Sequence, residues 1–341
     1  MIVVKVLLFS EGKNTFSKSG VGQALNHQVE ALGANNVEYT LNPDEEYDIV
    51  HINTLGLKSW KMLKKAKKMK KPVIYHTHTT YEDFKGSIKW SDQLAPVIRY
   101  WAKKSYNGAD YLISPTEYTK KLVSEKYLKN EKEIRVISNG VNTEKISKNE
   151  ELKKKFLEKY KIFKPLVITA GLPFERKGIK EFVKLAERCS DYQFLWFGSS
   201  SIKPMLPKKI QKIIDNPPKN LSFPGFVEKE ELIGAFSAAK LFLFMTYEEN
   251  EGIVVLESLS SKLPLVVRDI PVYEDWLQDG VNCFKARNND EFYKKMVSIV
   301  NDKVKNIDDI IENAYKIAEE RDLKNIGKKY KEYYEYILDK K

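Results

Sequence analysis

Short apolar runs alternate with amphipathic stretches along the chain. In the first half, the amphipathic stretches have apolar residues at helical spacing, and the apolar runs are short enough for buried strands. The predicted strands are Val3–Phe9, Ile49–Ile52, Val73–His76, Tyr111–Ser114 and Ile134–Ile137. The predicted helices are Val21–Leu32, Leu57–Met69, Leu94–Tyr106 and Tyr118–Tyr127. Strands that are separated by helices predict a parallel sheet covered on both faces.

The second half repeats this alternation after a polar stretch, Asn142 to Lys161, that is rich in Lys and Glu. Its predicted strands are Leu166–Ala170, Phe194–Phe197, Leu241–Phe244 and Leu265–Val267. Its predicted helices are Ile179–Arg188, Lys229–Ala238, Gly252–Ser260, Asp290–Val300 and, helical throughout, Ile307–Leu338. The predicted fold class is α/β, with two tandem Rossmann-like, doubly wound domains at residues 1–160 and 161–315 and a terminal helix at 316–341. Because ligands of open α/β sheets bind beyond the carboxyl ends of the strands, the cleft between the domains is the expected site.

The composition fits two globular domains. The chain has 341 residues, of which 42% are hydrophobic and 12% aromatic, enough for well-filled cores. No run approaches the roughly 18 apolar residues that would span a bilayer, and the N-terminus lacks a basic leader and a cleavage site. Cys189 and Cys283 match no metal or redox spacing, which favours a reducing cytoplasm. Four His leave little material for a metal site, so no metal is expected.

The charge distribution suggests a polyanionic partner. The formal net charge is +11, from 58 Lys and Arg against 47 Asp and Glu, which suits nucleic acid or the anionic face of a membrane. Lys58–Lys71 holds eight Lys and no acidic residue, and Ile88–Trp101 combines Trp and Tyr with Lys and Arg, as at a bilayer interface. Helices packed on a sheet would explain the apolar positions of both stretches equally well. The sequence contains no nucleic-acid-binding module.

Two carboxylates, Glu249 and Glu257, flank a predicted helix start at Gly252. A helix start leaves backbone N–H groups free and carries partial positive charge, which suits a diphosphate. Glu249 lies in the loop after a predicted strand, and Glu257 lies about one and a half turns into the helix. One anion site between two carboxylates would suit a sugar nucleotide, although two Glu at this spacing also arise by chance.

In each half of the chain, a glycine-containing loop follows the first predicted strand. Gly20 and Gly22 would allow a backbone to approach a ligand, but Leu25 leaves the dinucleotide-binding fingerprint incomplete, and a plain turn fits as well. Arg176 and Lys177 precede a glycine at a helix start. These two cations would neutralise a diphosphate, and a solvated basic turn explains them equally well.

A third loop carries His76 and His78 at the end of a predicted strand. Functional sites gather at such strand ends, although histidines there are often structural. Neither a Ser-His-Asp order nor a metal-ligand spacing accompanies them, so hydrolase and metalloenzyme chemistry are not expected.

In combination, these motifs resemble the retaining glycosyltransferases of family 4, which have the GT-B fold. The similar segments occur in the family's order and cover nearly the whole chain. They are Ser19–Gly22, His76–His78, Val136–Val141, Gly171–Gly178, Phe223–Phe226 and Glu249–Glu257. Four further segments are similar to bacterial diacylglycerol glycolipid synthases, which add a second hexose to a monoglucosyl-diacylglycerol: Leu8–Lys13, His51–Thr54, Phe174–Gly178 and Arg268–Tyr273.

The resemblance implies a UDP-glucose or UDP-galactose donor, no cofactor and no metal. Glu249 would contact hydroxyls of the donor sugar and stabilise charge at the reacting carbon, and Glu257 would hold the ribose. Arg176 and Lys177 would bind the diphosphate and replace a metal ion. The backbone groups that would complete the anion site belong to Gly20, Gly22, Gly252, Ile253 and Val254.

The resemblance assigns roles to two more residues, and the chain departs from the family's pattern at two points. His78 would lie at the donor sugar or the acceptor, and Phe226 would touch the uracil. The family has Arg after the glycine that matches Gly171, where this chain has Leu172, so Arg176 would supply that charge instead. Glu251 competes with Glu249 for the first carboxylate position, and the seven-residue gap before the second carboxylate favours Glu249.

The same resemblance implies the chemistry and the partners. The acceptor hydroxyl would attack on the face that the diphosphate leaves, with retention of configuration. The first domain would face a lipid acceptor, the second would bind the nucleotide sugar, and the terminal helix would cross back onto the first. The predicted hexosyltransferase is cytoplasmic and peripheral on the inner face of the cell membrane, bound through Lys58–Lys71 and Ile88–Trp101. The first alternative is a family 4 glycosyltransferase that acts on a soluble or undecaprenyl-linked glycan. The second alternative is a nucleic-acid-binding protein without enzyme activity.

Overall fold

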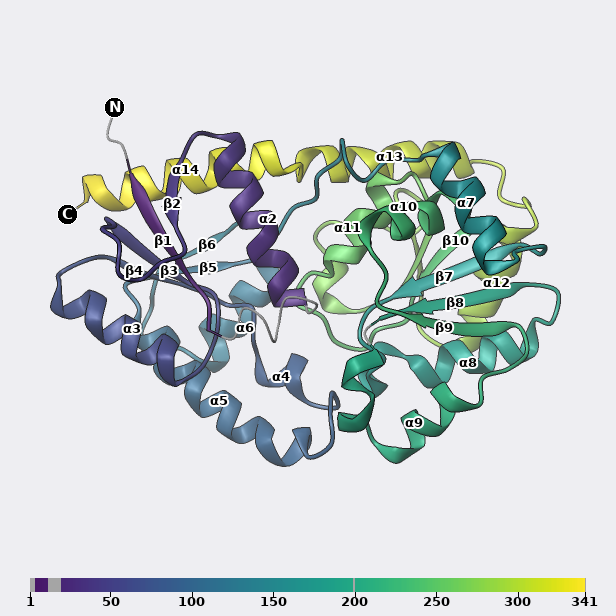
Figure 1. Ribbon diagram of the computed structural model, residues 1–341, viewed down its shortest axis with the longest axis horizontal. Coiled ribbons are helices and arrows are strands. Elements are labelled where there is room, and N and C mark those ends of the chain that lie inside the picture. Colours follow the sequence, from purple (N-terminus) through teal and green to yellow (C-terminus); the bar gives the residue numbers. More distant parts are fainter. Residues whose placement is uncertain (1–3, 12–19, 199, 341) are drawn as a thin grey trace. The chain divides into compact units, whose positions relative to one another are not determined.

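The structure, a computed structural model, describes residues 4–11, 20–198 and 200–340 (Figure 1). It divides into two compact units. Unit 1 comprises Met1–Lys85, Ser91–Gly140 and Arg321–Lys341, and unit 2 comprises Gly86–Trp90 and Val141–Glu320. Each unit holds one six-stranded parallel sheet, so the predicted α/β class with two doubly wound halves is confirmed. The sequence placed its domain limits near residues 160 and 315, whereas the units divide near residues 140 and 320.

The sheet of unit 1 has a buried centre and short edges. In spatial order its strands are β2 (Glu38–Thr40), β1 (Lys5–Phe9), β3 (Ile49–Ile52), β4 (Val73–His76), β5 (Tyr111–Ser114) and β6 (Ile134–Val136). All except β2 were predicted, and Val3, at the start of the first predicted strand, lies outside the described residues. The edge strand β2 was missed because it has three residues and begins with an exposed Glu.

Helices cover both faces of this sheet. On one face, α2 (Gly20–Ala34) and α14 (Leu323–Asp339) pack against each other and against the strands. A Cβ at Gly327 would lie 2.0 Å from the carbonyl oxygen of Ala31, so glycine is what lets these two helices touch. The other face is covered mainly by α3 (Leu57–Lys68), α5 (Ser91–Gly108) and α6 (Glu117–Lys126), with the short α4 (Tyr81–Phe84) packed against α5.

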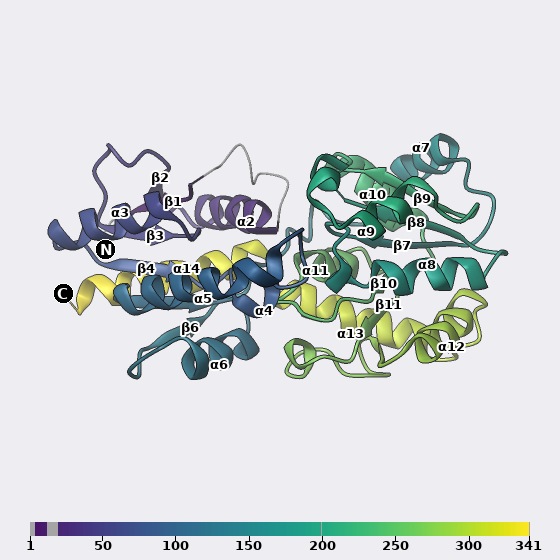
Figure 2. The ribbon, with the colours of Figure 1, turned by 90° about the horizontal axis from the view of Figure 1, so that it is seen from below.

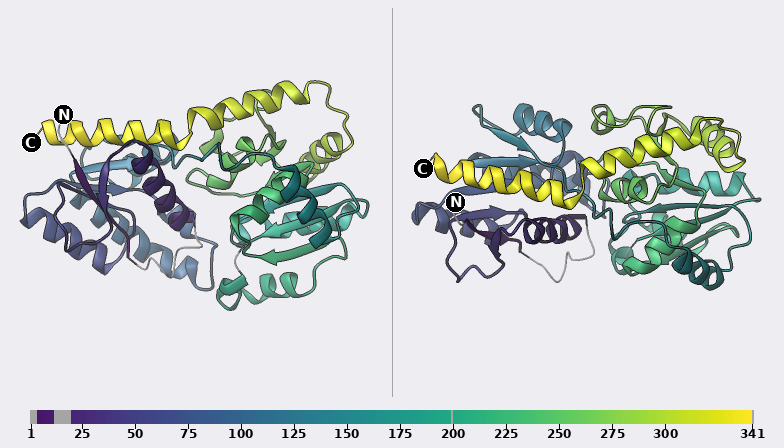
Figure 3. Two further views of the ribbon diagram at one scale, coloured as in Figure 1. Left: turned by 45° about the horizontal axis from the view of Figure 1, so that its top comes forward. Right: turned by 90° about the horizontal axis from the view of Figure 1, so that it is seen from above.

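The last part of the chain forms two helices, so the prediction of one continuous helix over Ile307–Leu338 is wrong (Figure 3). α13 (Ile307–Glu320) belongs to unit 2, and α14 begins at Leu323 in unit 1. Asp322 caps α14, because its side chain accepts a hydrogen bond of 2.9 Å from the backbone N–H of Lys324. The helical spacing of apolar residues on both sides of this cap concealed the break.

The sheet of unit 2 reverses its strand order near the middle. In spatial order its strands are β12 (Phe284–Ala286), β11 (Leu265–Arg268), β10 (Leu241–Phe244), β7 (Leu166–Ala170), β8 (Gln193–Phe197) and β9 (Leu221–Gly225). The edge strands β9 and β12 were not predicted, because β9 contains Pro and Gly and β12 has three residues. From β7 the chain extends the sheet to β8 and β9 on one side and later adds β10 on the other. The loops after β7 and β10 are therefore neighbours.

Helices again cover both faces of this second sheet. α8 (Ile179–Arg188), α9 (Lys208–Asp215) and α12 (Asn289–Val300) contribute to the core on one face. α7 (Glu150–Tyr160) and α10 (Lys229–Ala238) pack together on the other, and Figure 2 shows these two on the side of the sheet opposite α8 and α12. α11 (Ile253–Ser260) starts from the loop after β10 and packs against α13. Helix α7 lies within the polar stretch that the sequence had treated as a boundary.

Candidate functional site

The loops after β7 and β10 carry most of the candidate residues of unit 2. The loop after β7 contains a 3₁₀ turn at Glu175–Lys177, and the loop after β10 leads to the start of α11. Because β7 and β10 are paired neighbours at the reversal of the strand order, both loops leave the sheet at adjoining points. The structure therefore brings together four residues that the sequence proposed for one site, namely Arg176, Lys177, Glu249 and Gly252.

Lys177 and Glu249 form an ion pair between these two loops. Their side chains are only 12% and 13% exposed, so the pair lies largely out of solvent. Lys177 Nζ also lies 5.4 Å from the centre of the Phe244 ring. The resemblance assigned Lys177 to the diphosphate and Glu249 to the hexose, whereas the structure shows their two side chains in direct contact. Each charge thus has a protein partner that a charged ligand would have to replace.

Arg176 ties the 3₁₀ turn to the loop after β10. Its Nη1 donates a hydrogen bond of 3.0 Å to the carbonyl oxygen of Glu248, and its own carbonyl oxygen accepts one of 2.8 Å from the backbone N–H of Tyr247. Its Nε donates to the hydroxyl of Ser87 at 3.3 Å. Sequence reasoning missed Ser87, because no local pattern links residues that are 89 positions apart. The neighbouring Ile88 packs against the core of unit 2, so the predicted stretch Ile88–Trp101 is divided between the units.

Two glycines with positive φ shape these loops. Gly178 has φ 79°, and a Cβ there would lie 2.5 Å from the carbonyl oxygen of Met245. Gly252 has φ 88° and precedes α11, which begins at Ile253 rather than at the predicted Gly252. The N-cap residue of this helix is Gly252, which has no side chain that could cap it. The first-turn N–H groups, including those of Ile253 and Val254, therefore keep the partial positive charge of a helix N-terminus.

Glu257 lies on α11 and is 7% exposed. Burial raises the pKa of its carboxyl to about 7, and the positive charge of Lys229 acts in the opposite direction. Among the described residues, no group donates a hydrogen bond to this carboxylate. A buried carboxylate without a donor is costly unless a ligand supplies one, so Glu257 has the character of a binding residue.

Two buried residues, one at the end of β11 and one in the turn that follows it, complete the surroundings of the β10 loop, and sequence reasoning gave neither a role. Arg268 is buried, and its Nε donates a hydrogen bond of 3.0 Å to the carbonyl oxygen of Met245. Its guanidinium lies 3.8 Å from the centre of the Tyr247 ring. Tyr273 lies in the 3₁₀ turn Pro271–Tyr273 with its hydroxyl next to Gly252. The only signal for both was their presence in Arg268–Tyr273, one of the segments that carry the resemblance.

Three candidate residues, Gly20, Gly22 and His78, belong to unit 1. Gly20 is the first residue of α2 and Gly22 lies in the first turn, so both are helical and not part of a loop as predicted. The rest of that motif, residues 17–19, lies outside the described residues. The remaining candidate, Phe226, directly follows β9 of unit 2 and is 38% exposed.

His78 belongs to a buried stack of three imidazoles in unit 1. The ring centres of His76 and His78 are 3.7 Å apart, and those of His51 and His76 are 5.4 Å apart. His78 Nε2 lies 3.2 Å from Oδ1 of Asn53. Burial lowers the pKa of both His51 and His78 to about 3, and at His51 the neighbouring His78 adds to this effect. The histidines of this strand end are therefore neutral at physiological pH.

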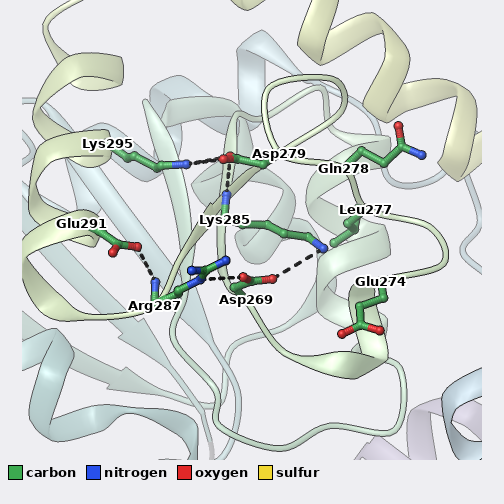
Figure 4. Close-up of a pocket in the computed structure, with 9 residues that line it drawn as sticks. All are labelled: Asp269, Glu274, Leu277, Gln278, Asp279, Lys285, Arg287, Glu291 and Lys295. Carbon is green, nitrogen blue, oxygen red and sulfur yellow. Dashed lines mark hydrogen bonds and ion pairs between the residues drawn. The ribbon is translucent and has the colours of Figure 1, made fainter.

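A charged pocket of about 520 Å³ lies beside β11 and β12 (Figure 4). Its walls carry opposite charges that compensate one another: Lys295 Nζ pairs with Asp279 at 2.6 Å, and Arg287 Nε donates to Asp269 at 3.0 Å. Such a wall favours neither an anion nor a cation. In the described parts of the chain, no three or more His, Cys, Asp or Glu gather where they could hold a metal ion.

Two sequence families match the chain. Residues 38–145 match the family described as Glycosyltransferase Family 4, and residues 148–317 match the one described as Glycosyl transferases group 1. A processive diacylglycerol alpha-glucosyltransferase of Acholeplasma laidlawii is 38% identical over 98% of this chain and 99% of that protein. An alpha-galactosylglucosyldiacylglycerol synthase of Streptococcus pneumoniae is 27% identical over 73% of this chain and 67% of that protein.

Solved structures show the same fold at low sequence identity. The HepE protein of Anabaena, in complex with UDP and glucose, is similar with a TM-score of 0.78 and 15% identity, over 96% of this chain and 98% of that one. A sucrose-phosphate synthase of Thermosynechococcus elongatus is similar with a TM-score of 0.79 and 14% identity, over 99% of this chain and 100% of that one. At these identities, the likeness concerns the fold alone.

Proposed function

Because the chain belongs to the glycosyltransferase family of the Acholeplasma laidlawii enzyme and has the GT-B fold, we propose that it transfers a hexose from UDP-glucose or UDP-galactose to a glycolipid such as monoglucosyl-diacylglycerol. The observation that carries this proposal is the 38% identity to the Acholeplasma laidlawii enzyme, which extends over 98% of this chain and 99% of that protein. The name of the Streptococcus pneumoniae relative supports an acceptor that already carries one hexose, and galactose as the other donor sugar.

We infer that unit 2 binds the donor. Lys177 and Arg176 bind the diphosphate, together with the N–H groups at the start of α11, because cations and a helix N-terminus both favour phosphate oxygens. The α11 groups are those of Gly252, Ile253 and Val254. Glu249, which adjoins Lys177 in the free protein, contacts hydroxyls of the hexose.

The remaining candidate residues contact other parts of the donor or the acceptor. Glu257 accepts hydrogen bonds from the ribose hydroxyls, which supplies the donors that its buried carboxylate lacks. Phe226, at the exposed end of β9, contacts the uracil. Gly20 and Gly22, at the start of α2, add backbone groups to the anion site, and His78 contacts the donor sugar or the acceptor.

The proposed reaction retains the configuration of the sugar. The acceptor hydroxyl oxygen bonds to the anomeric carbon on the face from which the diphosphate oxygen departs, and the proton of the hydroxyl passes to the departing phosphate. Charge that develops on UDP is stabilised by Arg176 and Lys177 and charge on the sugar by Glu249. Because these cations act on the leaving group, the reaction needs no metal ion.

The first unit carries a basic surface that suits the lipid acceptor. On α3, Met62, Leu63 and Ala66 are buried, as the packing alternative predicted, while the lysines of this helix are exposed. Lys104 of α5 places its Nζ 4.7 Å from the ring centre of Trp60 on α3. The two helices therefore join their basic and aromatic side chains on one surface.

The α5 helix adds apolar side chains to this surface. Leu94, Val97 and Tyr100 are exposed and recur every three residues, so they share one side of the helix. Exposed apolar and aromatic side chains next to lysines are typical of a surface that lies on an anionic bilayer. We infer that the protein binds the cytoplasmic face of the membrane peripherally through α3 and α5.

Among the described residues, no helix combines the length and the apolar character that crossing a bilayer requires.

A product assay tests this function. The full-length protein is mixed with micelles of monoglucosyl-diacylglycerol and labelled UDP-glucose or UDP-galactose, and the lipid product and its anomeric linkage are identified by mass spectrometry and NMR. We expect an α-linked diglycosyl lipid from at least one donor, at a rate that excess EDTA leaves unchanged. Glu249→Ala should lower the rate by about 100-fold or more without loss of the fold. No labelled lipid from the folded wild type would reject the proposal, and transfer only to a soluble glycan would favour the alternative acceptor.

A further inference from the structure

Tyr273 carries a hydroxyl that lacks a partner next to the loop of Glu249. The side chain is 0% exposed, and its hydroxyl has no hydrogen-bond partner among the described residues. A buried hydroxyl without a partner lowers stability, and most buried polar groups in proteins avoid that state. The hydroxyl of Tyr273 therefore indicates a hydrogen bond that forms in another state of the protein.

The hydroxyl lies at the start of α11. A Cβ built on Gly252 would lie 3.2 Å from this hydroxyl and 3.5 Å from Cγ of Glu249, so both side chains approach the same point. Burial raises the pKa of Tyr273 well above its ordinary value, and the nearby carboxylates of Glu249 and Glu251 raise it further. The phenol is therefore a protonated donor close to a carboxylate.

The turn that carries Tyr273 is held in place. Lys285 Nζ donates a hydrogen bond of 3.3 Å to the carbonyl oxygen of Tyr273 and lies 3.8 Å from Asp269, a pair visible in Figure 4. The Tyr273 ring packs edge-on against Trp276, with the ring centres 5.5 Å apart. A ring that is anchored in this way keeps its hydroxyl in one position, as a positioning role requires.

Glu249 is occupied by Lys177 in the free protein. The proposed donor site requires both residues to change partners, because Lys177 binds the diphosphate and Glu249 binds the hexose. A carboxylate of such low exposure that loses its lysine needs another donor.

We propose that Tyr273 is a positioning residue for Glu249: when Lys177 moves to the diphosphate of the bound donor, the hydroxyl of Tyr273 donates a hydrogen bond to the released carboxylate. This hydrogen bond keeps Glu249 directed at the hexose. The inference rests on the proposed function, because a UDP-sugar is what draws Lys177 away.

Tyr273→Phe tests this inference, since the substitution removes only the hydroxyl. We expect an equal or higher midpoint of thermal unfolding, because no hydrogen bond is lost in the free protein. UDP affinity should stay within about twofold of wild type, while kcat for hexosyl transfer should fall roughly five- to tenfold with little change in KM.

Tyr333→Phe is the matched control. It removes another buried hydroxyl that has no partner among the described residues, on α14 of unit 1. This variant should keep the wild-type kcat and KM. A wild-type kcat in Tyr273→Phe, with an active wild type, would overturn the role of Tyr273 alone. A wild type that transfers hexose from neither donor would instead overturn the proposed function, and this inference with it.

Discussion

Glu249 and Glu257 belong to one loop-and-helix segment but differ in electrostatic surroundings. Glu249 pairs with Lys177, whereas burial raises the pKa of Glu257 to about 7. The resemblance assigned both residues to one donor, Glu249 to the hexose and Glu257 to the ribose. Their neighbours in the folded protein make one a paired charge and the other a group that titrates near neutral pH.

Glu257→Gln should reveal two separate roles of Glu257, one in the pH dependence of stability and one in UDP binding. Because the folded pKa of about 7 lies above the ordinary value of 4.5, the native state binds more protons between these values, and the free energy of unfolding falls as pH rises from 4.5 to 7. Gln keeps the shape without titrating, so the variant should lose this part of the pH dependence and exceed wild-type stability at pH values above 7.

The same variant should bind UDP roughly tenfold more weakly, because Gln replaces a charged acceptor of the ribose hydroxyls by a neutral one. Denaturant unfolding at acidic and alkaline pH and calorimetric titration with UDP measure the two effects. An unchanged UDP affinity would remove Glu257 from the ribose site.

At the scale of elements, central strands were predicted well and edges poorly. β3, β4, β5, β7 and β10 have the predicted bounds because their residues are mostly apolar and are buried by sheet and helices on both faces. β2, β9 and β12 were missed, since β2 and β12 have only three residues and β9 contains Pro and Gly and is partly exposed. The break at Asp322 was missed because a capping residue was not distinguished from one on the polar face of a longer helix.

The basic helix α3 gives a prediction at this scale. Reversing three exposed charges, in Lys61→Glu/Lys64→Glu/Lys68→Glu, should weaken binding to anionic vesicles by more than about 100-fold at low salt, at about 1 kcal/mol for each lysine near the surface. Vesicle sedimentation measures this, and high salt should release the wild-type protein.

A control with the same change in charge lies on α9 of unit 2. Lys208→Glu/Lys209→Glu/Lys212→Glu alters three exposed lysines and should leave vesicle binding close to wild type. Equal losses in the two triple variants would show that net charge, and not the α3 surface, attracts the protein to the membrane.

At the scale of the whole molecule, the two units differ in how their buried groups respond to acid. The folded pKa of about 3 for His51 and His78 lies below the ordinary 6.5, so the unfolded state binds more protons between these values. Their contribution to stability is complete above pH 6.5 and is lost as the pH falls towards 3. Glu257 in unit 2 acts in the opposite direction, because its stability contribution is lost as the pH rises.

His76→Phe should reduce the acid sensitivity of unit 1. Both ring nitrogens of His76 are buried without a partner among the described residues, and phenylalanine keeps an aromatic ring in the stack. We expect the variant to lose less stability than wild type between pH 7 and pH 4.5. Denaturant midpoints at both pH values measure this, and parallel losses in the two proteins would assign the acid sensitivity to other groups.

The amino-acid sequence alone was enough to establish the alternation of strands and helices, the two parallel sheets and the strand-end loops that carry the candidate residues. This was possible because burial and backbone preference produce local patterns of apolar residues and glycines in the sequence, as in Leu241–Phe244 followed by Gly252. The contact of Lys177 with Glu249, the hydrogen bond that Arg176 donates to Ser87 and the hydroxyl of Tyr273, which has no partner among the described residues, are visible only in the folded chain. These contacts depend on which strands become neighbours, and strand order follows from packing of the whole sheet, which no local pattern records.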